Sequence, residues 1–202
     1  MFSNAPDPRS RPTPSQALQW LLDGNARFAA GRPERPRQDD AHRRALTGGQ
    51  HPHAVVLACS DSRVSVEILL DQGFGDLFVV RTAGHVLDRS VVASVEFAVA
   101  QLGVSVALVL GHESCGAVAA AQRYLAGGHE LPGSMPALVE GVRDHLDTQD
   151  PARDAVGRHV RGTISSLLAG SSLVREAVDG DLLTVAGGVY GLADGRITLV
   201  EG

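Results

Sequence analysis

The sequence predicts an α/β fold: a mostly parallel central β-sheet flanked by helices, with an N-terminal helical arm and a C-terminal β-hairpin. Two short apolar runs, 54–58 and 104–110, are typical of buried parallel strands. Stretches with helical apolar spacing alternate with such runs, as in βαβ units. Two further β-rich runs, 182–190 and 196–200, are joined by an Asp-Gly turn and predict the closing hairpin.

Length and composition limit the domain count and the classes of partner. The 202 residues, 44% of them hydrophobic, suffice for one core, so we expect a single domain over residues 15–202. A net charge of −5 provides no basic footprint, which argues against nucleic acid and anionic membrane surfaces as partners. No apolar run is long enough to cross a bilayer, and residues 1–15 are polar and proline-rich rather than a signal peptide. We therefore expect a cytoplasmic protein.

The N-terminal quarter is predicted to hold an arm, one amphipathic helix and a connection. Four prolines within residues 1–14 predict a disordered arm. Ser15 is a candidate N-cap, and apolar residues at helical spacing continue from it to Gly31. The apolar pattern of this helix is compatible with packing on the chain's own sheet. Residues 31–52 are charged and turn-rich, with room for a short helix at 41–46.

Two polar motifs follow the predicted buried strands. Cys59-Ser-Asp61-Ser-Arg63 comes after the first strand and His112-Glu-Ser-Cys115 after the other. Ligands bind at the carboxyl ends of strands in open α/β sheets, so we expect these side chains to meet. Two thiolates and one imidazole suit Zn²⁺ and leave one tetrahedral position open, as in catalytic zinc sites.

The same three residues also have a purely structural interpretation. Cys59 and Cys115 can be small buried hydrophobes, and His112 a hydrogen-bonded core histidine. His-x-x-Cys alone favours this interpretation, but a Cys-x-Asp-x-Arg motif at an equivalent strand end argues strongly against it. In a reducing compartment two cysteines are also better read as metal ligands than as a disulfide.

The middle of the chain predicts a right-handed βαβ unit and a buried helix. A crossover helix at 64–70 leads to a strand at 77–80, and 81–84 form another strand-end loop. His85 follows this loop and is interpreted as a turn residue. The helix at 90–102 has almost no polar face, so it needs covering on both sides. A second subunit is the best source of the second cover, and the alternative is the chain's own carboxyl-terminal region.

The remaining helices are predicted at 116–121, 137–146 and 156–168. The first begins directly after Cys115, where the positive end of the helix dipole favours a thiolate and where the Gly116 N–H can receive an anion. The other two carry no predicted chemistry, and we place His145 and His159 on their solvated faces.

Three segments together resemble the β-class carbonic anhydrases: Cys59-Ser-Asp-Ser-Arg-Val, Arg81-Thr-Ala-Gly-His and Gly111-His-Glu-Ser-Cys-Gly. The order and spacing of these motifs are preserved, and the resemblance runs from Trp20 to the carboxyl end. It implies zinc bound by Cys59, His112 and Cys115, and reversible hydration of carbon dioxide to bicarbonate and a proton by zinc-bound hydroxide.

The resemblance also implies roles for other residues. Arg63 is expected to pair with Asp61, to depress the pKa of that carboxyl group and to hold it as an acceptor for the zinc-bound water. It further implies a homodimer or homotetramer in which the substrate pocket forms partly across the interface and the helix that begins at Ser15 lies across a neighbouring subunit. The substrate-binding residues that it implies are Gln50, Phe78, Ala83 and Phe97, and Gly116 is added to them from its place at the start of a helix.

Some members of this family close the site by binding the aspartate to the metal. They carry a bicarbonate pocket made of a tryptophan, an arginine and a tyrosine. Arg81 matches the arginine and Tyr190 the tyrosine, but Val56 replaces the tryptophan. Together with the presence of Gln50, this replacement favours the constitutively open type, with closure by Asp61 at low pH as the alternative.

Two other functions are compatible with the motifs. The same scaffold could hydrolyse carbon disulfide or carbonyl sulfide, because hydroxide attack on these molecules is analogous and access to the pocket decides the substrate. A non-enzymatic zinc-binding or redox module is the other alternative. Such a module needs neither Asp61 nor Arg63, so the presence of both counts against it.

Overall fold

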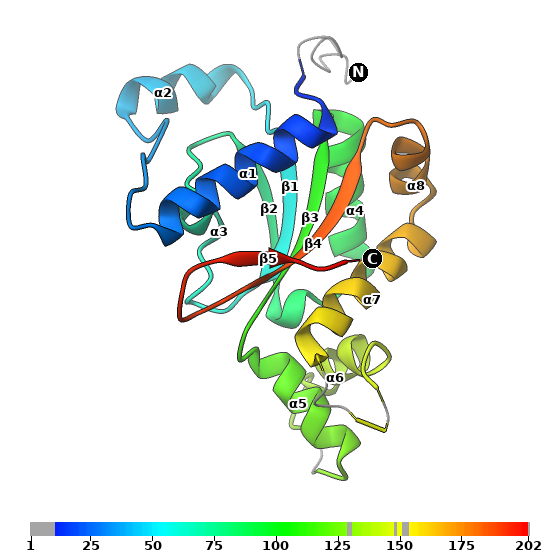
Figure 1. Ribbon diagram of the computed structural model, residues 1–202. Helices are drawn as coiled ribbons and strands as arrows, with labels where there is room; N and C mark the ends of the chain where they lie inside the picture. Colours follow the sequence, from blue (N-terminus) through cyan, green and yellow to red (C-terminus); the bar gives the residue numbers. More distant parts are fainter. Residues whose placement is uncertain (1–10, 129–130, 148, 151–153, 202) are drawn as a thin grey trace.

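The computed structural model describes residues 11–128, 131–147, 149–150 and 154–201, and it shows a five-stranded sheet between two layers of helices (Figure 1). This confirms the predicted fold class. The strands are β1 (Ala54–Cys59), β2 (Leu77–Thr82), β3 (Val106–His112), β4 (Thr184–Tyr190) and β5 (Ile197–Leu199).

The strand order explains where a site can form. The order is β2-β1-β3-β4-β5, with β1 to β4 parallel and β5 antiparallel to β4. The chain leaves β1 toward one edge of the sheet and leaves β3 toward the other. Connections that diverge in this way open a crevice between the two strand ends. Cys59 ends β1 and His112 ends β3, so both predicted motifs border this crevice.

Helices α1 (Pro14–Ala29) and α3 (Val66–Leu69) cover one face of the sheet (Figure 1). The buried face of α1 packs on the chain's own strands, while Trp20 on its other side is 49% exposed. Thr13, not the predicted Ser15, caps α1: its hydroxyl accepts from the Gln16 amide, and the Gln16 side chain accepts from the Thr13 amide. Residues 1–10 of the predicted arm lie outside the described residues.

The opposite face is covered by α4 (Arg89–Phe97) with its π-helical continuation η4 (Ala98–Leu102), by α7 (Ala155–Gly170) and by α8 (Ser172–Asp179). The sequence did not predict α8. The apolar helix predicted at 90–102 is confirmed as α4 and η4, but within the chain only one side of it is covered. Val91, Val95 and Ala98 are buried, whereas Phe97 is 44% exposed.

The remaining elements lie at the two ends of the sheet. Helices α5 (Gly116–Leu125) and α6 (Pro136–Arg143) lie beyond the carboxyl ends of the strands and share a small core with both cysteines. The connection α2 (Asp40–Ala45) and η2 (Leu46–Gly48) leads back to the amino end of β1.

The predicted solvated face is wrong for His159, and His145 is only partly exposed. His159 on α7 is fully buried, and His145, which follows α6, has its Nδ1 atom 2.9 Å from Nδ1 of His159. The reason is the packing of this segment on α7. Gly162 of α7 has no side chain, and a Cβ atom there would lie 2.2 Å from the His145 ring. The two histidines are therefore enclosed between segments that the sequence pattern treats separately.

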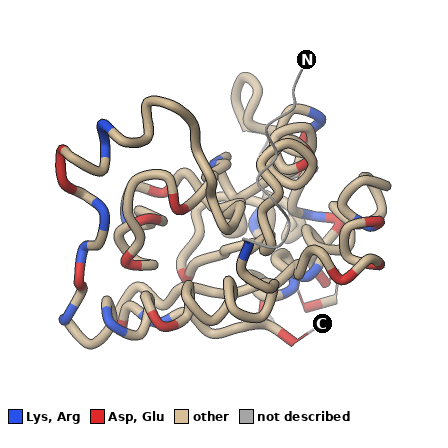
Figure 2. The backbone as a smooth tube through the Cα atoms, turned by 90° about the horizontal axis from the view of Figure 1, so that it is seen from above, with Lys and Arg blue, Asp and Glu red and all other residues tan. Residues whose placement is uncertain are grey.

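Basic and acidic residues are interspersed along the described part of the backbone (Figure 2). Within the described part of the chain, none of the helices combines the length and the apolarity that a membrane span requires.

Candidate metal centre

Cys59, His112 and Cys115 form one buried cluster in which each side chain offers a single ligand atom. These three atoms lie within 4.8 Å of one another. Cys59 comes from the end of β1, His112 from the end of β3, and Cys115 is the N-cap of α5. The structure thus brings together the three ligands that the sequence predicts.

The hydrogen bonds of His112 suit a metal ligand. Its Nδ1 atom lies 2.8 Å from the carbonyl oxygen of Glu113, which can only accept, so Nδ1 carries the proton. Nε2 must then present its lone pair, and this buried atom has no hydrogen-bond partner among the described residues. A metal ion is the partner that such an unsatisfied nitrogen beside two sulfurs fits. This observation on His112 agrees with zinc as the ion.

The backbone between the two ligands of this segment adopts an uncommon conformation. Ser114 has a φ of 55°, in the left-handed region that a non-glycine residue rarely adopts. This single reversal turns the chain from the end of β3 into the start of α5. It brings His112 and Cys115 to the same side, at a cost of about 1–2 kcal/mol for the conformation.

Hydrogen bonds to the sulfur favour a thiolate at Cys59. The pKa of its thiol is lowered, first because Cys115 donates a hydrogen bond to it, with a further contribution from the amide of Gly84. The Gly84 amide nitrogen lies 3.2 Å from Cys59 Sγ. The same contact raises the pKa of the Cys115 thiol. A divalent cation would displace this second proton on binding.

Asp61 and Arg63 form a two-pronged ion pair beside the cluster. Arg63 donates from Nε to Asp61 Oδ1 at 2.9 Å and from a terminal nitrogen to Oδ2 at 2.8 Å. Asp61 Oδ2 lies 3.9 Å from the unsatisfied His112 Nε2. Hydrogen bonds from the Arg63 side chain and amide hold the pKa of the Asp61 carboxyl far below its usual value. The site therefore combines three soft-to-borderline ligands with an ionised acceptor.

Comparison with known proteins places this site in a family. The sequence profile of the carbonic anhydrases matches residues 54–197, which is more than half of the chain. The chain belongs to the carbonic anhydrase family. Carbonic anhydrase 2 of Mycobacterium tuberculosis is 46% identical over 195 residues, covering 92% of each chain, and the carbonic anhydrase of Mycolicibacterium smegmatis is 43% identical over 92% and 93%.

Solved structures assign the chain to the β class. A β-carbonic anhydrase of Aspergillus fumigatus superimposes with a TM-score of 0.68 at 28% identity, covering 93% of this chain and 90% of that one. The β-carbonic anhydrase of Coccomyxa, solved in complex with acetazolamide, gives a TM-score of 0.69 at 25% identity, covering 91% and 86%. Reversible hydration of carbon dioxide is the function of this family, and its β class uses zinc, in agreement with the Cys-His-Cys cluster.

Ala83 and Gly116 lie close to the ligands in this carbonic anhydrase fold. Ala83 directly precedes Gly84, which donates to Cys59, and Gly116 directly follows Cys115 at the exposed start of α5. A Cβ atom at Gly116 would have nothing within 4 Å, so the space beside its amide is open. Both positions are compatible with the predicted contact to a small substrate.

Gln50, Phe78 and Phe97 are not brought to the ligands of their own chain. Phe78 pairs with Val55 of β1. Val55 lies four residues before Cys59, so Phe78 is displaced from that ligand by about 13 Å along the strand direction. Its ring lies 6.0 Å from that of Phe97, on the face covered by α4. Gln50 is exposed and precedes the amino end of β1, whereas Cys59 ends that strand. Within one chain these three residues cannot line a pocket at the metal centre.

Arg81 supports the loop between the ligand and the carboxylate. Its side chain donates to the carbonyl oxygen of Cys59 at 2.9 Å and to that of Asp61 at 2.8 Å. Sequence reasoning considered Arg81 only as part of a bicarbonate pocket with Tyr190. The side chain of Tyr190 packs instead into the core beneath α1. The strand of Arg81, β2, is separated from that of Tyr190, β4, by β1 and β3.

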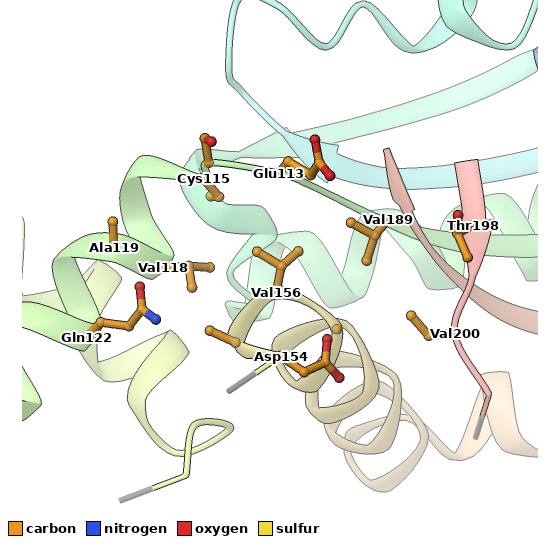
Figure 3. A pocket seen from close by; sticks show the side chains of 13 residues that line it. Glu113, Cys115, Val118, Ala119, Gln122, Asp154, Val156, Val189, Thr198 and Val200 are labelled. Carbon is orange, nitrogen blue, oxygen red and sulfur yellow. The ribbon is translucent and has the colours of Figure 1, made fainter. Parts of the chain in front are cut away.

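A cavity of about 510 Å³ adjoins the metal centre on the side of Cys115 (Figure 3). It lies between α5, the start of α7 and the β4–β5 hairpin, and Val118, Val156 and Val189 form part of its apolar wall. Neither Asp61 nor Arg63 lines it. The cavity therefore adjoins Cys115 away from the Asp61–Arg63 pair.

Sequence reasoning missed two groups that shape the centre. The carbonyl oxygen of Glu113 orients His112, and the amide of Gly84 donates to Cys59. Backbone groups leave no signature in the residue type, so only the turn glycine in Arg81-Thr-Ala-Gly84 could have drawn attention to this position.

Proposed function

We propose that this chain hydrates carbon dioxide reversibly at a zinc ion held by Cys59, His112 and Cys115, with Asp61 and Arg63 as catalytic residues. The observation that carries the proposal is the unsatisfied His112 Nε2, buried between two thiols and 3.9 Å from the Asp61 carboxylate. Zinc, when bound, supplies a Lewis acid that acidifies a water molecule and so provides the nucleophile for carbon dioxide.

Asp61 orients the reacting water in this proposal. Both of its oxygens accept hydrogen bonds from Arg63, which keeps the carboxylate ionised, so it acts as an acceptor and not as a proton donor. Arg63 also holds the carboxylate in one position, because its amide donates to Asp61 Oδ1 at 2.9 Å. A water that donates one hydrogen to Asp61 directs a lone pair away from it, toward the carbon atom of the substrate.

The open form is the resting form in this proposal. Asp61 is engaged by Arg63 through both oxygens, and closure onto the ligands would break these bonds. Arg81 is likewise occupied by two carbonyl oxygens rather than directed into a bicarbonate pocket. Val56 in place of the tryptophan of the closing branch agrees with this state.

The substrate pocket is completed by a second copy of the chain in a homodimer or a multiple of it. Gln50, Phe78 and Phe97 lie too far from their own ligands to contact substrate there, so they can serve only the site of another copy. The exposed ring of Phe97 and the edge strand β2, which pairs only with β1 among the described strands, provide the surface for such a copy.

A cytoplasmic location belongs to the same proposal. Both cysteines are free and buried, and zinc binding requires them as thiolates rather than as a disulfide. Fractionation of the producing cells tests the location, and recovery of the protein outside the cytoplasm would contradict it.

Stopped-flow hydration of carbon dioxide, with zinc measured in the same sample, tests the function. We expect about one zinc per chain and a hydration rate proportional to the zinc content. His112→Ala and Cys59→Ser should lose most of the zinc together with the activity. Full zinc retention in both variants would rule out the ligand set, and a zinc-loaded wild type without hydration activity would rule out the function.

A further inference from the structure

Three histidines, two of them fully buried and the third half-buried, lie close together near the metal centre and have no role in the proposed mechanism. His85 follows β2, His145 follows α6, and His159 belongs to α7. The rings of His85 and His159 stack with their centroids 4.3 Å apart, and the ring centroid of His145 lies 5.1 Å from that of His159. Such a group of imidazoles needs a specific arrangement of protons, because each nitrogen can donate or accept but not both.

The hydrogen bonds determine this arrangement. His159 Nε2 lies 2.6 Å from the carbonyl oxygen of Gly84, so Nε2 must carry the proton. In a neutral ring Nδ1 then accepts, and its partner at 2.9 Å, Nδ1 of His145, must donate. Nε2 of His145 accepts in turn from the hydroxyl of Ser166 at 3.1 Å. The donors therefore all point one way, from Ser166 through His145 and His159 to Gly84.

The charges of the rings agree with this neutral chain. Burial lowers the pKa of both His145 and His159, and that of His159 falls to about 4. Both rings are therefore neutral near pH 7.

Gly84 connects this chain to the metal centre. Its carbonyl oxygen accepts from His159, while its amide donates to Cys59 Sγ at 3.2 Å. The residue has a φ of +65°, and a Cβ atom would lie 2.6 Å from Cβ of Ala117, so only glycine fits the turn. Without His159 the buried carbonyl group would lose its donor, and the turn that directs the amide at the sulfur would lose its support.

We propose that His159, oriented by His145, is a positioning residue of the metal centre: it holds the Gly84 turn so that the Gly84 amide donates to the sulfur of Cys59. The proposal rests on the ligand set of the proposed function. A hydrogen bond to a metal-ligating thiolate fixes its orientation and withdraws charge from the sulfur. Loss of such outer contacts typically costs about 10- to 100-fold in metal affinity.

Two substitutions of His159 separate the hydrogen bond from the packing of the ring. His159→Phe keeps a ring that can stack on His85 but removes the donor to Gly84. His159→Gln keeps an amide donor close to the position of Nε2. We expect about 10- to 100-fold weaker zinc binding in His159→Phe, measured by competition with a chelator, and near wild-type affinity in His159→Gln.

A spectroscopic readout distinguishes positioning from a general loss of stability. In the cobalt-substituted protein, the thiolate-to-cobalt charge-transfer band should move to lower energy in His159→Phe, because the sulfur loses a donor. It should stay unchanged in His159→Gln. His42→Phe is a matched control, since His42 Nε2 lies 3.1 Å from another backbone carbonyl oxygen, that of Phe74, far from the cysteines in the connection before β1. This control should change neither zinc affinity nor the band.

Wild-type zinc affinity and an unshifted cobalt band in His159→Phe would overturn the proposal. If that variant does not fold, His159→Asn decides, because its amide is too short to reach the Gly84 carbonyl and the same losses are expected. These readouts do not depend on catalysis. Failure of the wild type to hydrate carbon dioxide would therefore count against the proposed function alone.

Discussion

The chemistry of this protein depends on side chains whose hydrogen-bonding role is determined by a neighbouring group, either a backbone carbonyl or another side chain. The Glu113 carbonyl forces the proton of His112 onto Nδ1 and leaves Nε2 for the metal. Arg63 donates to both oxygens of Asp61 and keeps it ionised. Each residue is held in one protonation state before any substrate arrives, so little reorganisation is needed during the reaction.

Asp61→Asn tests this preorganisation. The amide has nearly the same shape, but one of the two acceptor oxygens becomes a donor, so we expect the turnover number for carbon dioxide hydration to fall by about 100-fold or more. Zinc content should be unchanged, because Asp61 is not one of the three ligands. Asp40→Asn provides a control, since Asp40 forms a comparable but exposed pair with Arg44 in α2. Full activity of Asp61→Asn would remove Asp61 from the mechanism.

At the scale of elements, a buried polar residue connects segments that are distant in the sequence. Asn25 of α1 donates to the carbonyl oxygens of Leu69 in α3 and of Gly195 in the hairpin turn, at 3.0 and 2.9 Å. It also accepts from the amide of Ile197 in β5 at 2.8 Å. This single side chain therefore joins the amino-terminal helix to the carboxyl-terminal strand.

Asn25→Ala should destabilise the protein by about 3 kcal/mol, because it leaves two buried carbonyl groups and one partly buried amide without their partner. Urea unfolding followed by circular dichroism measures the change. Gln19→Ala on the same helix is the control: its side chain bonds only to exposed Asp23, so the expected change is within about 0.5 kcal/mol. Equal free energies of unfolding for the two variants would show that the hydrogen bonds of Asn25 do not stabilise the fold.

At the scale of the whole molecule, the outer side of α4 is the surface that the proposed function assigns to a second copy of the chain. The inner side of this helix is buried on the sheet, and its outer side presents Phe97 to solvent. Apolar side chains on both sides of one helix are explained when a second copy covers the outer side.

Phe97→Asp should therefore shift the protein from a dimer, or a multiple of one, toward monomers and reduce carbon dioxide hydration. The charge would have to be buried on assembly, which is unfavourable. Analytical ultracentrifugation at micromolar concentration measures the state. Leu173→Asp, at a comparably exposed apolar position on α8, serves as the control. A fully active wild-type monomer would contradict the shared pocket.

The buried histidines also predict how global stability depends on pH. The pKa of His159 is lowered from 6.5 to about 4, mainly by burial, so the unfolded chain binds this proton more readily than the folded one. The contribution of neutral His159 to the free energy of unfolding is fully present above pH 6.5 and is lost as the pH falls toward about 4. Its size is on the order of 3 kcal/mol. Urea unfolding of wild type and His159→Gln across this range measures it. The variant should lose less stability on acidification, and identical pH dependence would contradict the assignment.

The sequence alone determined the fold class, the three ligands and the Asp61–Arg63 pair. These features depend on local signals: apolar runs that form buried strands, and polar motifs at the ends of those strands, which a parallel sheet brings to one edge. Asp61 and Arg63 are two residues apart, so their pairing also follows from a short segment.

Only the tertiary structure decided which distant residues share an environment. His159 is buried, and His145 is half-buried, because a segment after α6 packs on Gly162 of α7, a contact that residue type and helical period do not encode. Gln50, Phe78 and Phe97 are separated from the ligands of their own chain because β1 places Cys59 at its carboxyl end. The physical reason is the same in each case. Burial and proximity are set by contacts between segments far apart in sequence, whereas periodicity and motif spacing describe only neighbours along the chain.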